Sequence, residues 1–267
     1  MKKRTKNISF LTHHNLLSGV ILILSFTFIA GAVGVNAQPM EGKIRYLVTH
    51  NWAKELAAVD YLSKEQRDRV TYMWGSRSEW KEFTEMYFNP SKTRYQDSEE
   101  KAEPDDEGYS WRRDIYNINR DFSNHTIIDL IQMLGKEYII EDTLRPQPWK
   151  ILNDIKEVAG HICMDASWHD TLKQQKITAW FAMDIPLSGG PERFCGLPGM
   201  ILEVEVNNGA MVITADKIEM KPLTTEMDLP KKIKGKHIHE QDYYRILKKH
   251  MDERKADEEP PFWGIRY

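Results

Sequence analysis

The chain has 267 residues, of which 41% are hydrophobic, and a formal net charge of −3 at pH 7. This hydrophobic content is enough to build a core, whereas the small negative charge argues against electrostatic binding to nucleic acid. Its eight Trp and eleven Tyr are many for this length; such side chains line ligand grooves, but they also serve as ordinary packing in β-sheets, which we favour here.

The start of the chain has the order of a secretory signal peptide. A positive cluster at residues 2–6 precedes an uncharged, largely apolar run at residues 16–33, and Val35 and Ala37 place small side chains where a signal peptidase reads them. We predict cleavage between Ala37 and Gln38, followed by export. The alternative is an uncleaved anchor, because the run approaches the roughly 20 residues that span a bilayer. Membrane contact is expected only through this segment, before cleavage.

The following part of the chain mixes strand and helix patterns. Residues 42–48 alternate apolar and polar side chains, as a half-buried strand does, and residues 80–95 contain a second strand. Between them, residues 53–70 predict one or two helical turns, with a capping-box pattern at residues 63–66. The acidic segment 98–108 is predicted to be a solvated loop, because it lacks the alternating oxygen ligands and fixed glycine of a calcium loop.

The second half predicts a series of strands joined by turns. Five segments have strand patterns: residues 149–158, 160–169, 177–183, 200–206 and 210–218. Asn208-Gly209, between the last two, is the strongest short signal for a β-hairpin. This succession predicts a mainly β fold built on an antiparallel meander, with one apolar face and one mixed face.

The charged tail of the chain changes character again. Residues 239–257 predict a C-terminal helix with a thin apolar stripe, which would lie across a core, remain solvated or bind a partner. The chain is therefore predicted to comprise a signal peptide (1–37), a single β-rich domain (38–236) and a helical tail (237–267).

The two cysteines, Cys163 and Cys195, are predicted to form a disulfide. An even number of cysteines in an exported chain favours one, and closing a loop of about 32 residues would stabilise the fold by roughly 3–4 kcal/mol on the chain-entropy model. A hairpin centred near residue 172 would place Cys163 opposite Ala182. The loop 184–199, which carries Cys195, leaves the sheet at that same end, so the geometry permits the bond.

One loop carries a distinctive motif. Asp184-Ile185-Pro186 precedes the hexapeptide Gly196-Leu197-Pro198-Gly199-Met200-Ile201. With this motif the chain resembles the GLPGLI family of exported Bacteroidota proteins, with Met200 in place of the family's Leu. Further segments agree with the family pattern, namely residues 42–46, 86–89, 149–151, 160–166 and 178–181. The family has no established activity. The resemblance implies export and a predominantly antiparallel sheet, and an analogy with periplasmic lipoprotein carriers implies a curved half-barrel.

The hexapeptide is easier to explain as structure than as chemistry. Residues 197–200 fit a type II turn, in which Pro198 presets φ at the second position and Gly199 accepts a positive φ at the third. Leu197, Ile201 and Leu202 are expected to anchor the loop in the core. No side chain of Gly-Leu-Pro-Gly can act as acid, base or nucleophile, so we predict a rigid corner, with a ligand-contacting backbone as the alternative.

No catalytic, metal or cofactor site is predicted. His161 and His169 share one face of a strand but lie too far apart to hold one metal ion. His237 and His239 are a pair, which falls short of the three or four ligands of a zinc site. The sequence also lacks the common nucleophile, metalloprotease and phosphate-binding motifs.

We therefore expect a non-catalytic binding module of the cell envelope, in the periplasm, at the outer membrane or in the medium. Trp168, Trp180 and Phe194 are its candidate binding surface, for a hydrophobic small molecule, a peptide or an envelope protein. Two alternatives stay open: an accessory protein of an outer-membrane transport system, and an uncharacterised enzyme. A dry cavity would favour binding of an apolar ligand, and a flat apolar patch would favour a protein partner. A cleft with clustered ionisable groups would favour an enzyme.

Overall fold

The computed structural model describes residues 40–73, 79–102, 115–262 and 264–266. The predicted signal peptide, its cleavage site at Ala37 and Gln38, and residues 103–108 of the acidic segment lie outside the described residues. Residues Gln38–Tyr267 form one compact unit.

All strands of the described residues belong to one sheet. Its order is β12-β6-β5-β4-β3-β2-β1-β11-β10-β9-β8-β7, and β12 pairs with β6 in parallel while the other neighbours are antiparallel. The strands are β1 (Gly42–Asn51), β2 (Glu79–Asn89), β3 (Lys92–Asp97), β4 (Tyr116–Asp121), β5 (Thr126–Met133), β6 (Lys136–Thr143), β7 (Lys150–Val158), β8 (His161–Asp170), β9 (Gln175–Ala182), β10 (Met200–Val206), β11 (Met211–Met220) and β12 (Lys236–Ile238). The helices are α1 (Trp52–Ala57), α2 (Lys64–Met73) and α3 (Glu240–Ala256). The prediction of a mainly β fold with short helices is confirmed.

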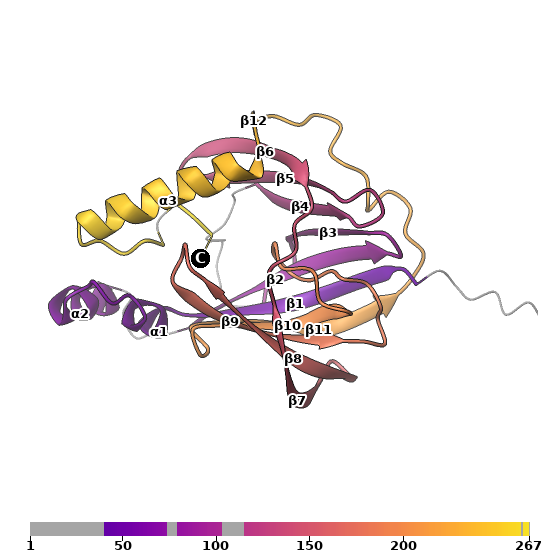
Figure 1. Ribbon diagram of the computed structural model, residues 1–267, viewed down its shortest axis with the longest axis horizontal. Coiled ribbons are helices and arrows are strands. Elements are labelled where there is room, and N and C mark those ends of the chain that lie inside the picture. The colour runs from indigo at the N-terminus through magenta and orange to yellow at the C-terminus, as the bar shows by residue number, and fades with distance from the viewer. Residues whose placement is uncertain (1–39, 74–78, 103–114, 263, 267) are drawn as a thin grey trace, which may run out of the picture. The chain divides into compact units, whose positions relative to one another are not determined.

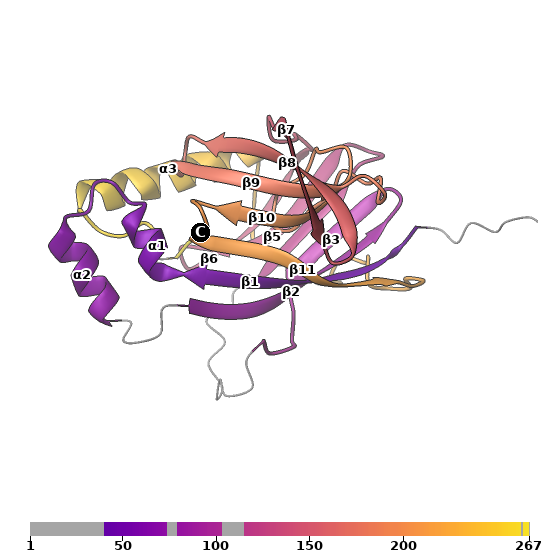
Figure 2. The same cartoon turned by 90° about the horizontal axis from the view of Figure 1, so that it is seen from below.

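The sheet is curled, so that its two halves face each other (Figures 1 and 2). Figure 1 shows β4, β5 and β6 on one side of the interior and β8 to β11 on the other, with α3 alongside β6. Ile44, Tyr46 and Val48 of β1 are fully buried, and the residues between them are half-buried, as the two-residue period of a strand requires. The predicted half-barrel is thus an open, curled antiparallel sheet with its core on the concave side.

Strands β3, β4, β5, β6 and β12 were not predicted, and β4, β5 and β6 are three of the twelve strands of the sheet. The apolar alternation of β5 is interrupted by Asp129, which has no exposed surface. Its carboxylate pairs with Arg120 of β4, whose side chain is 5% exposed. A buried ion pair therefore conceals the pattern by which a strand is recognised in a sequence.

Helix α2 begins with its predicted capping box, and α3 lies over the core. The Ser63 backbone N–H donates to Gln66 Oε1 at 2.7 Å, and the Gln66 N–H donates to Ser63 Oγ at 3.2 Å, which completes the capping box at the start of α2. In α3, Leu247 is buried and Tyr243 and Ile246 pack against the main core. The apolar stripe of α3 therefore lies across the core, the first of its predicted alternatives.

The predicted disulfide is wrong for this structure. Both cysteines lie among the described residues, and both are buried free thiols. Cys163 does lie opposite Ala182, as expected from the hairpin. The loop, however, carries Cys195 away to the segment before β7, where the Cys195 N–H donates to Gln147 Oε1 at 2.9 Å and its carbonyl accepts from Trp149 Nε1 at 2.8 Å. The two thiols consequently lie apart.

Candidate functional site

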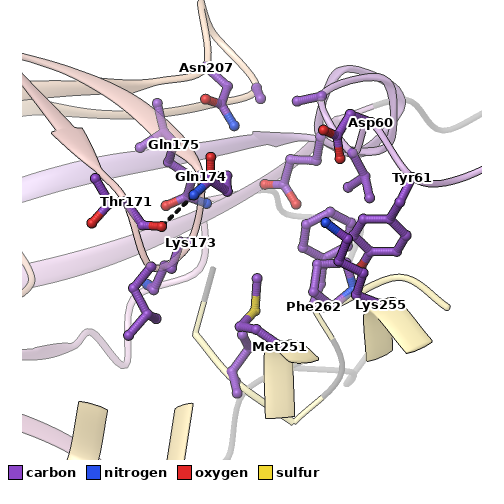
Figure 3. A pocket seen from close by; sticks show the side chains of 18 of the residues that line it. Asp60, Tyr61, Thr171, Lys173, Gln174, Gln175, Asn207, Met251, Lys255 and Phe262 are labelled. Carbon is purple, nitrogen blue, oxygen red and sulfur yellow. Dashed lines mark hydrogen bonds between the residues drawn. The ribbon is translucent and has the colours of Figure 1, made fainter. Parts of the chain in front are cut away.

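A pocket of about 600 Å³ opens at one end of the curled sheet. It lies between the segment that follows α1, the β8–β9 and β10–β11 turns, and α3 (Figure 3). Its apolar lining includes Val59, Val206, Met211, Met251, Phe262 and Ile265. Its polar lining includes Asp60, Lys173, Gln174, Gln175, Asn207 and Lys255. This volume, with apolar walls and a few polar groups, is typical of small-molecule sites.

Two turns supply amide side chains to one side of the pocket. Asn207 and Asn208 have φ values of +49° and +54°, in the left-handed region that Asn tolerates better than most residues. Asn207 Oδ1 accepts the Lys176 N–H at 2.9 Å, which ties the β10–β11 turn to β9. Gln174, with φ +54°, donates to the Thr171 carbonyl at 2.5 Å across the β8–β9 turn. The predicted Asn-Gly hairpin thus also forms part of the pocket.

The opposite side is aromatic and charged. Figure 3 shows Tyr61, Phe262 and Lys255 facing the two turns, with Met251 projecting from α3. The Lys255 ammonium lies 5.9 Å from the centre of the Tyr61 ring, a cation–π contact. Burial, and to a lesser extent the nearby Asp60 carboxylate, raise the pKa of the Tyr61 hydroxyl. This hydroxyl therefore stays protonated at neutral pH and donates to the Glu259 carbonyl at 3.0 Å.

A buried histidine–carboxylate pair borders the pocket, and the sequence analysis did not identify it. Glu55 of α1 lines the pocket with 6% of its surface exposed, and its Oε1 lies 3.1 Å from Nδ1 of His50. His50 is 3% exposed and stacks on Trp52. Asn51 caps α1 between them, accepting the Lys54 N–H at 3.0 Å. The sequence signal that could have revealed this pair is the close spacing of His50, the helix cap Asn51 and Glu55.

The candidate binding surface from the sequence lies elsewhere. Trp168 and Phe194 form a half-buried cluster with Trp149, with ring centres 6.0–6.4 Å apart, and they pack against the main core. Trp180 lies under the Lys156 ammonium, which is 4.2 Å from its ring centre. None of these residues lines the described pocket.

The hexapeptide forms a corner, but not by the predicted turn. Gly199 does not have a positive φ; the residue that does is Gly196, at +98°. Gly199 is required for another reason, because a Cβ atom there would lie 2.2 Å from the Ala182 carbonyl oxygen. Leu197, Ile201 and Leu202 are buried as expected. Met200 is also buried, and its N–H donates to the Ile185 carbonyl at 2.9 Å.

A buried ionic cluster fastens the loop of the motif to α3. Arg193 donates from Nε to Asp129 Oδ2 at 3.0 Å and from a terminal nitrogen to Glu240 at 2.7 Å. Asp129 also pairs with Arg120, and Glu240 with Arg145 at 3.2 Å. The neighbouring carboxylates and tyrosines raise the pKa of the Arg193 guanidinium despite its burial. These groups satisfy one another, so we interpret the cluster as an anchor.

The described ranges contain no group of three or more His, Cys, Asp or Glu side chains that could hold a metal ion. Within the same ranges, no helix combines the length and the apolar character that crossing a bilayer requires.

The fold and the pocket define a β-rich protein with an open, curled sheet. A family model described as a protein of unknown function (Porph_ging) matches residues 165–203, which include the hexapeptide. No curated protein matches the chain. Solved structures of PNGF-II in the P21 and C2 space groups are similar in fold, with 15% and 13% identity over 78% and 77% of this chain and a TM-score of 0.51 each. The matched region covers only 33% and 32% of those longer chains. At this identity the likeness concerns the fold alone.

Proposed function

We propose that this protein is an exported, non-catalytic binding module of the cell envelope that holds a small molecule or a peptide in the pocket at the end of its sheet. The observation that carries the proposal is the pocket itself, whose apolar walls and polar rim suit a ligand with both kinds of surface. The similarity of residues 165–203 to a family of unknown function, together with the Gly196–Ile201 motif, supports membership of the GLPGLI family. The leader sequence supports export.

The pocket can be tested by filling it. In Met251→Trp, the larger side chain should occupy space between α3 and the two turns, because Met251 lines the pocket and is only half-buried. We expect the mature protein recovered from its native envelope to carry a co-purifying molecule, detected by mass spectrometry, and the variant to carry several-fold less of it.

The matched control is Met220→Trp, since Met220 is 56% exposed and does not line the pocket. This control should retain the bound molecule at the wild-type level. Recovery of an unliganded wild-type protein in every preparation, or equal occupancy in both variants, would contradict the proposal.

One surface favours the protein-partner alternative, a role as an accessory of outer-membrane transport. Ile151, Ile155 and Ile162 are 48%, 66% and 63% exposed, and they lie on β7 and β8, where β7 is the last strand of the sheet. An exposed apolar edge strand is suited to pairing with another chain. Ile155→Lys should then abolish cross-linking to an envelope protein, while Met251→Trp should leave it unchanged.

A further inference from the structure

Four side chains, those of Tyr95, Asp97, Tyr116 and Glu192, surround one guanidinium group, and we call the place that they enclose the recess. Arg266 donates to both carboxylate oxygens of Asp97, at 3.1 and 2.5 Å, and from Nε to Glu192 Oε1 at 3.0 Å. Its guanidinium carbon lies 3.8 Å from the centre of the Tyr116 ring. Tyr95 donates its hydroxyl to the same Glu192 oxygen at 2.9 Å.

This arrangement has the geometry of specific arginine recognition rather than of a surface ion pair. Glu192 is 5% exposed and the Arg266 side chain 10%, so solvent screens this contact little, whereas the Asp97 side chain is 25% exposed. The fork of the guanidinium matches the Asp97 carboxylate, and its flat face stacks on Tyr116. A lysine ammonium lacks the planar fork for the two-point contact and the flat face for stacking. The recess therefore selects for shape as well as charge.

Among its described residues, the segment that supplies Arg266 is held by isolated contacts instead of a strand ladder. The Gly264 carbonyl accepts the Leu134 N–H at 2.7 Å, the Pro261 carbonyl lies 2.9 Å from His250 Nε2, and Lys173 Nζ donates to the Arg266 carbonyl at 3.1 Å. Segments with few backbone hydrogen bonds open locally at a lower free-energy cost than the whole fold.

The same segment connects the recess with the pocket. Pro261, Phe262 and Ile265 line the pocket, while Arg266 occupies the recess. Displacement of Pro261, Phe262, Ile265 and Arg266 together would remove part of the pocket wall and vacate the recess at the same time. A ligand that enters both must carry an apolar part and a guanidinium.

We propose that the recess of Tyr95, Asp97, Tyr116 and Glu192 is a binding site for an arginine side chain of a peptide ligand, and that Arg266 occupies it as a tethered internal ligand. The proposal rests on the proposed function, since it names the ligand class for the connected pocket. The peptide's arginine takes the place of Arg266 against Asp97, Glu192 and Tyr116, and no covalent step is involved.

The test uses Nα-acetyl-arginine amide as the probe and isothermal titration calorimetry as the measurement. Arg266→Ala should bind the probe at least about tenfold more tightly than the wild-type chain, because tethered Arg266 competes at an effective concentration on the order of millimolar or more. The lysine analogue should bind the variant at least about tenfold more weakly than the arginine probe. Adding Asp97→Asn to Arg266→Ala should abolish the gain.

A second measurement uses the unmodified chain, in case Arg266→Ala does not fold. The arginine probe should accelerate hydrogen exchange of the Leu134 amide in a saturable manner, because that amide is bonded to Gly264 only while the segment is docked. The lysine analogue should not do so. Equal probe affinity of folded Arg266→Ala and wild type, or unchanged Leu134 exchange at saturating probe, overturns the assignment. Either result leaves the Met251→Trp comparison intact, so a failure here is distinguishable from a failure of the proposed function.

Discussion

Two glycines of the 196–201 motif lie where the chain leaves no room for a side chain. A Cβ atom on Gly196 would lie 2.2 Å from Cβ of Pro146, and its φ of +98° disfavours any L-residue. Gly135, by comparison, has a φ of +70° but nothing within 4 Å of its Cβ position. Comparing Gly196 with Gly135 therefore separates the cost of a side chain at positive φ from the cost of its clash with neighbouring atoms.

We expect Gly196→Ala to lower the free energy of unfolding by about 2–5 kcal/mol, because backbone strain and overpacking act together. Gly135→Ala, with strain alone, should cost about 1–2 kcal/mol. Urea denaturation of the mature protein measures both. Equal losses would show that the contact with Pro146 contributes nothing.

At the scale of elements, the fold depends on how α3 and the 184–199 loop are joined to β4 and β5. Arg193 bridges Asp129 of β5 and Glu240 at the start of α3, and Arg120 supports Asp129 from β4. Arg193 also lies 4.4 Å from the centre of the Tyr243 ring. The loop, the helix and one half of the sheet therefore share one set of buried charges.

Asp129→Ala should lower the free energy of unfolding by about 3–5 kcal/mol, because it leaves two buried guanidinium groups without their shared carboxylate. The control is Lys249→Ala, which removes an exposed pair with Glu253 and should change stability by no more than about 0.5 kcal/mol. Thermal unfolding followed by circular dichroism distinguishes them. A loss for Asp129→Ala as small as that of the control would refute the anchoring role.

At the scale of the whole molecule, the two thiols belong to different parts of the curl. Burial, followed by the charge of Asp184, raises the pKa of Cys163 to about 11. Burial also raises the pKa of Cys195, whose charged neighbours are Arg120, Arg193, Asp129 and Glu240. Since the thiolate is the reactive form, both cysteines should be inert in the native protein.

In protein denatured without reductant, we expect intact-mass analysis to show alkylation of both cysteines, and in native protein at pH 8 to show almost none. Alkylation that occurs only after reduction would show that the disulfide is present.

The raised pKa of Cys163 also predicts how stability depends on pH. Between pH of about 9 and about 11 the folded thiol stays protonated while the unfolded thiol ionises, so the free energy of unfolding should decline over this range.

Much of the fold was predictable because its signals are local. The alternation in β1, the Asn-Gly turn, the Ser63–Gln66 capping box and the α3 stripe each depend on residues close together in sequence. Five of the described strands escaped prediction: β3, β4, β5, β6 and β12. In β5, Asp129 carries a charge at a core position because it pairs with Arg120 of the neighbouring strand β4. An ion pair between two strands cannot be recognised from the sequence until it is known which strands are neighbours.

The sequence by itself determined the strands with a clear alternation, the Asn-Gly turn, the C-terminal helix and the leader pattern. Tertiary structure alone decided that Trp168 and Phe194 pack against the core, that the cysteines lie apart, and that Arg266 enters the recess. The pocket likewise joins Val59, Gln174, Asn207 and Met251, which are far apart in the chain. Their proximity follows from the curl of the sheet, and curl arises from how all the strands pack together, whereas alternation arises from each strand alone.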